Sequence, residues 1–302
     1  MKVVAALVAV AVCGMSAVSV AAALPQEVRW GDEARDIAKI DSLLRVLPDA
    51  GTAEPGALMV KVGESFIGTP YVAGTLEGSP DGDSAAEGVA EALTINTGEL
   101  DCTTFVELAA AVVGAYREGA ASWTDVAERL RDMRYRGGKV DGYASRHHYV
   151  SDWITENTYR GSVKEVTPEA PNSRQKALSL DFMTRHRDKY PVLADSATFE
   201  RMRSVERGLR GIKTYFIPKA TLGSKDAMAF MRDGDIVFIT TSIGGLDVTH
   251  AGIIVKDSTT GEPHMLHAST RAGKVILDPQ PLHSYLARNK TATGIRLVRL
   301  AR

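Results

Sequence analysis

The sequence is poor in the residues that define several common classes of protein. It contains only two cysteines in 302 residues, Cys13 and Cys102, which is too few for a disulfide-stabilised scaffold. It has no His-Glu-x-x-His or Cys-x-x-Cys motif, and His264 and His267 would point to opposite faces of a predicted strand. A zinc hydrolase is therefore disfavoured, and we expect neither a metal nor a cofactor.

An excess of charge of one sign is also missing. Lys and Arg number 36 and Asp and Glu number 37, so the formal net charge is −1. A nucleic-acid-binding protein needs clustered positive charge to displace counterions, and a polybasic membrane-binding surface needs a similar excess. We therefore expect no nucleic-acid partner.

Long apolar runs are absent beyond the N-terminus. Residues 3–20 carry no charge, follow Lys2 and precede three alanines at 21–23, which is the pattern of a cleaved secretory signal. Removal of residues 1–23 leaves 302 − 23 = 279 residues, none of which form a run long enough for membrane insertion. Val12 precedes Cys13 where a lipidation signal would have a small residue. The sequence thus predicts an exported, periplasmic protein without a lipid anchor on Cys13.

Apolar periodicity predicts helices in the first half of the chain and strands in the last third, which indicates an α+β fold. Helices are expected over residues 32–47, 57–67, 103–116 and 281–288, with another beginning near residue 122. Strands are expected over residues 91–97, 213–217, 235–240, 249–255, 264–268, 274–277 and 294–300. No regular period is evident from residue 137 to about residue 210.

Cys102 is the first candidate for chemistry, because it is the only cysteine left after the signal is removed. It lies at the junction of a loop and the apolar helix predicted from Thr103. The positive end of a helix dipole favours thiolate, and free N–H groups there can stabilise an oxyanion. The alternative is a buried, inert structural cysteine.

Histidine is the natural base for a thiol nucleophile, because it can also protonate a leaving amine. Of the seven histidines, His250 opens one predicted strand and His267 closes the next. The turn-rich residues 256–261 join these strands as a hairpin, so the two side chains are expected at the same end of it. One imidazole can then orient the other.

Five short motifs occur in one order along the chain, and together they resemble the NlpC/p60 family of papain-like cell-wall hydrolases. They are Gly68-Thr69-Pro70-Tyr71, Asp101-Cys102-Thr103-Thr104-Phe105, Asp233-Gly234-Asp235-Ile236, His250-Ala251-Gly252-Ile253 and Leu266-His267-Ala268. The resemblance implies a papain-like core in which a nucleophile helix packs on a mostly antiparallel sheet.

The same resemblance assigns roles to the residues that match the motifs. Cys102 is the nucleophile, His250 the base and His267 the orienting residue, while Tyr71 supplies a hydroxyl near the thiol. Thr103 stands where the family has serine, at a position that supports the oxyanion region. Residues 24–67 are then an N-terminal helical segment, and residues 68–302 are the catalytic domain.

The gap from Cys102 to His250 is 148 residues, which indicates an insertion at about 118–212. With the helical N-terminus, this insertion resembles a subgroup linked to N-acetylmuramoyl-L-alanine amidase activity. We expect substrate contacts from a polar and aromatic set in and beyond the insertion: Arg146, His148, Tyr149, Asp152, Trp153 and Asp247. Tyr149 and Trp153 could equally belong to the core of the insertion.

The expected substrate is peptidoglycan or its muropeptide fragments, and the expected reaction is hydrolysis of the amide between N-acetylmuramic acid and L-alanine. Two alternatives stay open from the sequence. One is an endopeptidase that cuts the bond between D-Glu and the diamino acid of the peptide stem. The other is a cell-wall binding protein without catalysis, which would not need a complete set of Cys102, His250 and His267.

Overall fold

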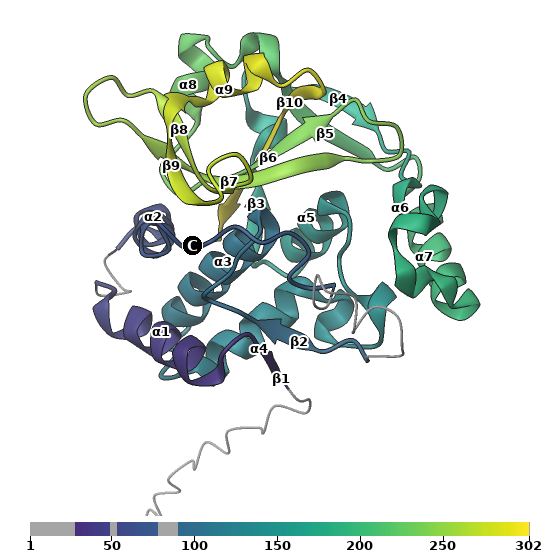
Figure 1. The fold of residues 1–302 in the computed structure, drawn as a ribbon. Helices are drawn as coiled ribbons and strands as arrows, with labels where there is room; N and C mark the ends of the chain where they lie inside the picture. The colour runs from purple at the N-terminus through teal and green to yellow at the C-terminus, as the bar shows by residue number, and fades with distance from the viewer. Residues whose placement is uncertain (1–27, 49–52, 78–89, 302) are drawn as a thin grey trace, which may run out of the picture.

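The computed structural model describes residues 28–48, 53–77 and 90–301 (Figure 1), and the expected signal at 1–23 lies outside them. The helices are α1 (Glu33–Val46), α2 (Pro55–Glu64), α3 (Cys102–Arg117), α4 (Trp123–Arg134), α5 (Val150–Tyr159), α6 (Phe182–Arg185), α7 (Ser196–Leu209), α8 (Lys225–Phe230) and α9 (Leu282–Arg288). The strands are β1 (Val28–Trp30), β2 (Leu93–Ile95), β3 (Val163–Glu165), β4 (Arg174–Ala177), β5 (Lys213–Pro218), β6 (Ile236–Thr241), β7 (Val248–Lys256), β8 (Pro263–Ser269), β9 (Lys274–Pro281) and β10 (Ala292–Leu300). Within these residues no helix is both long and apolar enough to cross a bilayer.

One eight-stranded sheet organises the molecule. Its strands follow the order β4-β5-β10-β6-β7-β8-β9, with β3 also paired to β10, and all of these pairs are antiparallel. Strands β1 and β2 form a separate parallel pair. The predicted α+β class with a mostly antiparallel sheet is therefore confirmed.

The sheet has an apolar core on each face. Side chains alternate along β6, so Ile236 and Phe238 face α3 while Val237 and Ile239 face α8 and α9. Figure 1 shows α8 and α9 above the sheet and α1 to α5 below it. Helix α3 is apolar on nearly all sides, as predicted, because it is enclosed by the sheet, α2 and α4.

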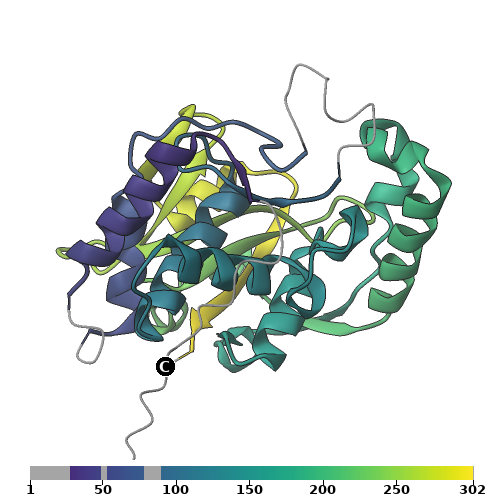
Figure 2. The same ribbon diagram turned by 90° about the horizontal axis from the view of Figure 1, so that it is seen from below.

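The expected insertion is not one separate lobe. Helices α4 and α5 contribute Leu130 and Ile154 to the same core as α3, and β3 joins the main sheet. Around α6 and α7 lies a third apolar cluster, which includes Met202 and Leu209 (Figures 1 and 2). The prediction that no regular period occurs from residue 137 to about residue 210 was wrong for α7. Its apolar residues Phe199, Met202, Val205 and Leu209 have helical spacing, but the many charges between them obscured it.

The Gly-Asp pair at the start of β6 is structural. Asp235 is fully buried and forms a bidentate ion pair with Arg299 at 2.6 and 2.8 Å. Gly234 has φ +78° and touches Gly56 of α2 so closely that a Cβ atom would lie 2.3 Å from the Gly56 Cα. This contact sets the distance between α2 and the sheet.

Gly234→Ala should destabilise the protein more than Gly211→Ala. Both glycines have positive φ, at +78° and +81°, so alanine costs about 1 kcal/mol at either position. Only Gly234 meets backbone atoms, whereas a Cβ at Gly211 has nothing within 4 Å. We expect an additional loss of about 1–3 kcal/mol in the free energy of unfolding at Gly234. Equal losses in urea denaturation of the two variants would contradict the close packing of α2.

Candidate active site

Cys102 is the first residue of α3, and the residue before it determines where the helix begins. The Asp101 carboxylate accepts the backbone N–H groups of Thr103 at 3.0 Å and Thr104 at 2.8 Å, and the Thr104 hydroxyl accepts the Asp101 N–H. This reciprocal capping stabilises the first turn. The Thr103 N–H is therefore occupied by the Asp101 carboxylate and is not free to donate to an oxyanion. This corrects the predicted role of Thr103 in the oxyanion region. The Thr103 hydroxyl instead favours the anionic form of the Cys102 sulfur.

The half-buried Cys102 thiol lies against the start of β7. The backbone N–H of Ala251 lies near enough to the sulfur to favour its anionic form, and Ala251 directly follows His250 in the chain. Helix α3 packs on β7 and β8, which brings the sole described cysteine beside the strand that carries the predicted base. The structure thus brings Cys102 and His250 into one site.

His250 and His267 are joined by a short hydrogen bond. The His250 Nε2 and His267 Nδ1 atoms are 2.6 Å apart, and the rings cross at 84°. The contact follows from the antiparallel register of β7 and β8, in which Ile253 is opposite Leu266. His250 and His267 are then diagonal neighbours on one face of the sheet. The predicted hairpin and the expected proximity of the two imidazoles are both observed.

Sequence reasoning missed a third member of this row, Asp278 of β9. Its Oδ2 atom lies 3.6 Å from Nε2 of His267, whose side chain is fully buried. That distance is long for a hydrogen bond but short for an electrostatic contact. No local motif marks Asp278, because only the pairing of β8 with β9 brings it to His267.

The arrangement of Asp278, His267 and His250 in a row determines which nitrogen of each imidazole carries the proton. The carboxylate favours a proton on His267 Nε2, which leaves His267 Nδ1 as an acceptor. The 2.6 Å contact then requires His250 Nε2 to be the donor. His250 therefore keeps an unprotonated Nδ1, as a general base must.

Thiol and imidazole are both neutral in the resting site. Burial, reinforced by the Asp101 carboxylate, raises the pKa of Cys102 to about 11 against the lowering effect of the Ala251 N–H. Burial, together with His267, lowers the pKa of His250 to about 3. The helix N-terminus was expected to favour thiolate, but desolvation opposes that effect and raises the pKa of the thiol.

Two tyrosines complete the surroundings of the thiol. The backbone N–H of Tyr71 donates to the Gly273 carbonyl at 2.9 Å, and the Thr270 side chain lies near its hydroxyl. Burial, together with the nearby Cys102, raises the pKa of Tyr71. Tyr285 of α9 stacks on His250, with 6.4 Å between ring centroids. Tyr71 thus lies near the sulfur as the sequence motifs suggested, whereas Tyr285 was not foreseen.

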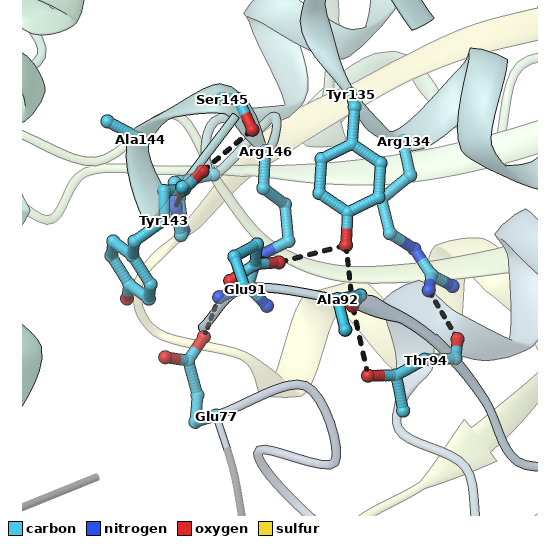
Figure 3. A network of polar contacts seen from close by, with 12 residues as sticks. Glu77, Glu91, Ala92, Thr94, Arg134, Tyr135, Tyr143, Ala144, Ser145 and Arg146 are labelled. Carbon is cyan, nitrogen blue, oxygen red and sulfur yellow. Dashed lines mark hydrogen bonds and ion pairs between the residues drawn. The ribbon is translucent and has the colours of Figure 1, made fainter. Parts of the chain in front are cut away.

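Arg146 is not available to a substrate, and its predicted role is corrected. The guanidinium is buried, bonds Glu77 at 2.8 Å and lies 3.4 Å from a Glu91 oxygen (Figure 3). Burial opposes its charge, but the carboxylates of Glu77 and Glu91 outweigh that effect and raise its pKa. Tyr135 donates to Glu91 at 2.9 Å in the same network. Arg146 therefore ties the residues before and after segment 78–89 to the body of the protein.

The other predicted contacts within 146–153 are also internal. Tyr149 and Trp153 are 1% and 5% exposed, so the core alternative holds for both. His148 bonds the Tyr143 carbonyl at 2.8 Å, and burial lowers its pKa well below the usual value. Asp152 pairs with Arg136 and His147 rather than facing solvent.

Asp247 is placed differently from the other five. Its oxygens accept the N–H groups of Ser151 at 2.7 Å and Val248 at 2.8 Å, and it lines a pocket at the start of β7. It is thus the one predicted substrate contact that borders an open volume. Across the described ranges, no three His, Cys, Asp or Glu side chains are grouped as a metal site requires.

The alkylation rate of Cys102 should depend on pH as expected for a thiol whose pKa is raised. A pKa of about 11 leaves thiolate at about 10⁻⁴ of the population at pH 7. The rate with iodoacetamide, measured on a chain lacking residues 1–23, should therefore rise about tenfold per pH unit up to about pH 10. The same chain in urea should react faster at pH 7. A plateau between pH 5 and 7 that disappears in His250→Ala would instead demonstrate a resting thiolate–imidazolium pair.

The proton arrangement is testable by ¹⁵N NMR of the histidine rings. We expect wild-type His267 to carry its proton on Nε2, because the Asp278 carboxylate faces that atom. Asp278→Ala should give a mixture of His267 tautomers without loss of the folded state. A wild-type His267 protonated on Nδ1 would contradict the assignment of His250 as the donor in the 2.6 Å contact.

Comparisons with known proteins identify similar chains. A family model described as AmiA-like, N-acetylmuramoyl-L-alanine amidase-like, matches residues 61–295. No curated protein compared with the chain matches it. An N-acetylmuramoyl-L-alanine amidase structure from Bacteroides uniformis is 33% identical with TM-score 0.75, covering 83% of this chain and 100% of that one.

Two further solved structures are similar. A proposed xylanase from Bacteroides fragilis is 37% identical with TM-score 0.72, covering 80% of this chain and 100% of its own. A Legionella pneumophila protein shares the fold at 21% identity and TM-score 0.64, covering 89% of this chain and 96% of its own. The family match spans 235 of the 302 residues. The chain belongs to the AmiA-like, N-acetylmuramoyl-L-alanine amidase-like family.

Proposed function

We propose that the protein is a cysteine-dependent amidase that hydrolyses the bond between N-acetylmuramic acid and L-alanine in peptidoglycan or muropeptides. The observation that carries the proposal is the single site formed by Cys102, His250 and His267. A thiol on a helix N-terminus lies beside an oriented imidazole, in a chain of the amidase-like family. The arrangement also supports the resemblance to NlpC/p60 hydrolases, which stays a prediction.

The neutral resting pair determines the first step of the proposed reaction. As the Cys102 sulfur attacks the lactyl carbonyl of the muramoyl group, His250 Nδ1 takes the thiol proton. The imidazolium that forms donates through Nε2 to His267, and Asp278 stabilises the charge behind it. The Cys102 N–H, which the Asp101 carboxylate does not accept, is the backbone donor for the oxyanion.

Collapse of the adduct breaks the C–N bond, and His250 returns its proton to the alanine nitrogen that leaves. A muramoyl thioester remains on Cys102. Water, deprotonated by His250, then attacks the thioester, and His250 returns that proton to the leaving Cys102 sulfur. The muramoyl carboxylic acid that is released loses its own proton to solvent. Atoms and charge balance without a cofactor in this sequence of steps.

Of two alternative functions, only the first uses the same residues. An endopeptidase of the stem would place the carbonyl of D-Glu at Cys102 and needs no sugar in the site. A xylanase, as proposed for one similar protein, would need two carboxylates on either side of a glycosidic bond. Here Asp101 caps α3 and Asp278 lies behind His267, so the thiol chemistry is better supported.

We also propose that the protein is exported to the periplasm. Support comes from the signal-like pattern of residues 1–23 and from the location of the proposed substrate outside the cytoplasmic membrane.

Digestion of a defined muramoyl-tripeptide, followed by mass spectrometry, tests the proposal. We expect release of free tripeptide, with no activity in Cys102→Ala and a loss of about 10³-fold or more in His250→Ala, because nucleophile and base act as a unit. His186→Ala, directly after α6, is the matched control and should retain activity, since that ring bonds the Phe182 carbonyl and packs on the Phe182 ring. Cleavage within the stem would support the endopeptidase, and an active Cys102→Ala protein would refute the cysteine mechanism.

A further inference from the structure

A pocket of about 310 Å³ lies away from the thiol, and the proposed chemistry does not use it. None of Cys102, His250 and His267 lines it. Its walls come from β4, β5, the ends of β6 and β10, the loop before β7, and the residues around the start of α6. In Figure 1, α6 lies beside the edge of the sheet formed by β4 and β5.

The pocket presents charges of both signs. Lys176 of β4 and Arg185 of α6 are largely exposed and supply positive charge, and Arg185 has only a loose contact of 3.5 Å with Asp181. Asp181 and Asp247 supply negative charge. The fifth charged residue of the lining, Arg296, is already paired with Glu165 at 2.9 Å and is therefore not free for a ligand.

A buried hydroxyl lines the same pocket without a partner. Thr214 is 8% exposed, and its Oγ1 atom has no hydrogen-bond partner in the described part of the chain. It is directly opposite Lys176 in the pairing of β4 with β5, so the two side chains are on one face of the sheet. An unpaired buried hydroxyl is costly, and a polar ligand in the pocket would satisfy it.

The distance to the catalytic centre suits the peptide stem. Asp247 precedes His250 by three residues, which is about 10 Å in extended chain. From the amide that the thiol attacks, two stem residues span about 7 Å, and the side chain of the third residue adds several more. The third stem residue can therefore reach the pocket while the first is at Cys102.

We propose that this pocket binds the diamino-acid residue of the peptide stem by its free end, which carries one ammonium and one carboxylate. Lys176 and Arg185 receive the carboxylate, Asp181 and Asp247 receive the ammonium, and Thr214 adds a hydrogen bond. This subsite deepens the amidase function proposed above and rests on it. It makes the enzyme selective for stems that contain diaminopimelate over stems that contain lysine, which lacks the second carboxylate.

Calorimetric binding to the intact Cys102→Ala protein tests the subsite without any need for hydrolysis. The probes are L-Ala–γ-D-Glu–diaminopimelate and the same peptide with L-Lys in the third position. We expect the diaminopimelate peptide to bind about tenfold more tightly, because charge-assisted hydrogen bonds to its extra carboxylate are lost with lysine. Adding Lys176→Gln or Arg185→Gln should reduce this preference to about twofold or less.

Arg174→Gln is the matched control, because Arg174 lies two residues from Lys176 on β4 but does not line the pocket. It should leave the preference unchanged. Thr214→Val should weaken both peptides equally, since both can reach the hydroxyl. No binding, no preference between the peptides, or a preference that survives both pocket variants would overturn the proposal.

Hydrolysis of the two muramoyl-tripeptides by the wild-type protein separates the two proposals. If both are cleaved at the alanine amide with equal kcat/KM and bind without preference, the amidase stands and the subsite fails. If neither is cleaved but the pocket-dependent preference in binding is found, the subsite stands as a peptide site and the amidase fails.

Discussion

The hydrogen bond between the His250 and His267 rings is the contact on which the rest of the site depends. It requires β7 and β8 to pair in one register, because a shift of one residue would turn one ring to the other face of the sheet. Helix α3 packs on the same two strands, and the Ala251 N–H of β7 lies near the Cys102 sulfur. The hairpin therefore positions the base and the orienting residue, and the packing of α3 brings the nucleophile to them.

Burial holds the side chains of this site in one geometry. It also disfavours the negative charge that a reactive thiol would otherwise carry. A desolvated thiol with its pKa near 11 and an imidazole with its pKa near 3 are a poor resting ion pair. The same low-dielectric surroundings strengthen the contacts of His250 with His267 and of His267 with Asp278 once a proton has moved. Such a site spends little time as a thiolate, which limits unwanted oxidation of the sulfur.

The residues predictable from sequence are those whose roles follow from local pattern. The start of α3 at Cys102, the strands of the last third and the hairpin bearing His250 and His267 depend on periodicity, capping and turn composition, which are local. Asp278 was not predictable, because its role arises only from the pairing of β8 and β9. Arg146 was misassigned for the opposite reason: its composition suits a ligand contact, but its partners Glu77 and Glu91 are 69 and 55 residues away in the chain.

The buried network around Arg146 nevertheless bears on recognition of the substrate. Arg146 ties residues 77 and 91 to the segment that contains Tyr143, and Tyr143 packs in the same apolar cluster as Leu178 and Leu180. Those two leucines line the pocket beside α6. A buried ion pair is a weak source of net stability but holds its partners in one geometry, since leaving either charge unpaired is costly. Arg146, which the sequence analysis predicted to contact the ligand, thus supports the wall of the pocket instead. Lys176 and Arg185 lie on the rim of the pocket, are more exposed and are available to the ligand.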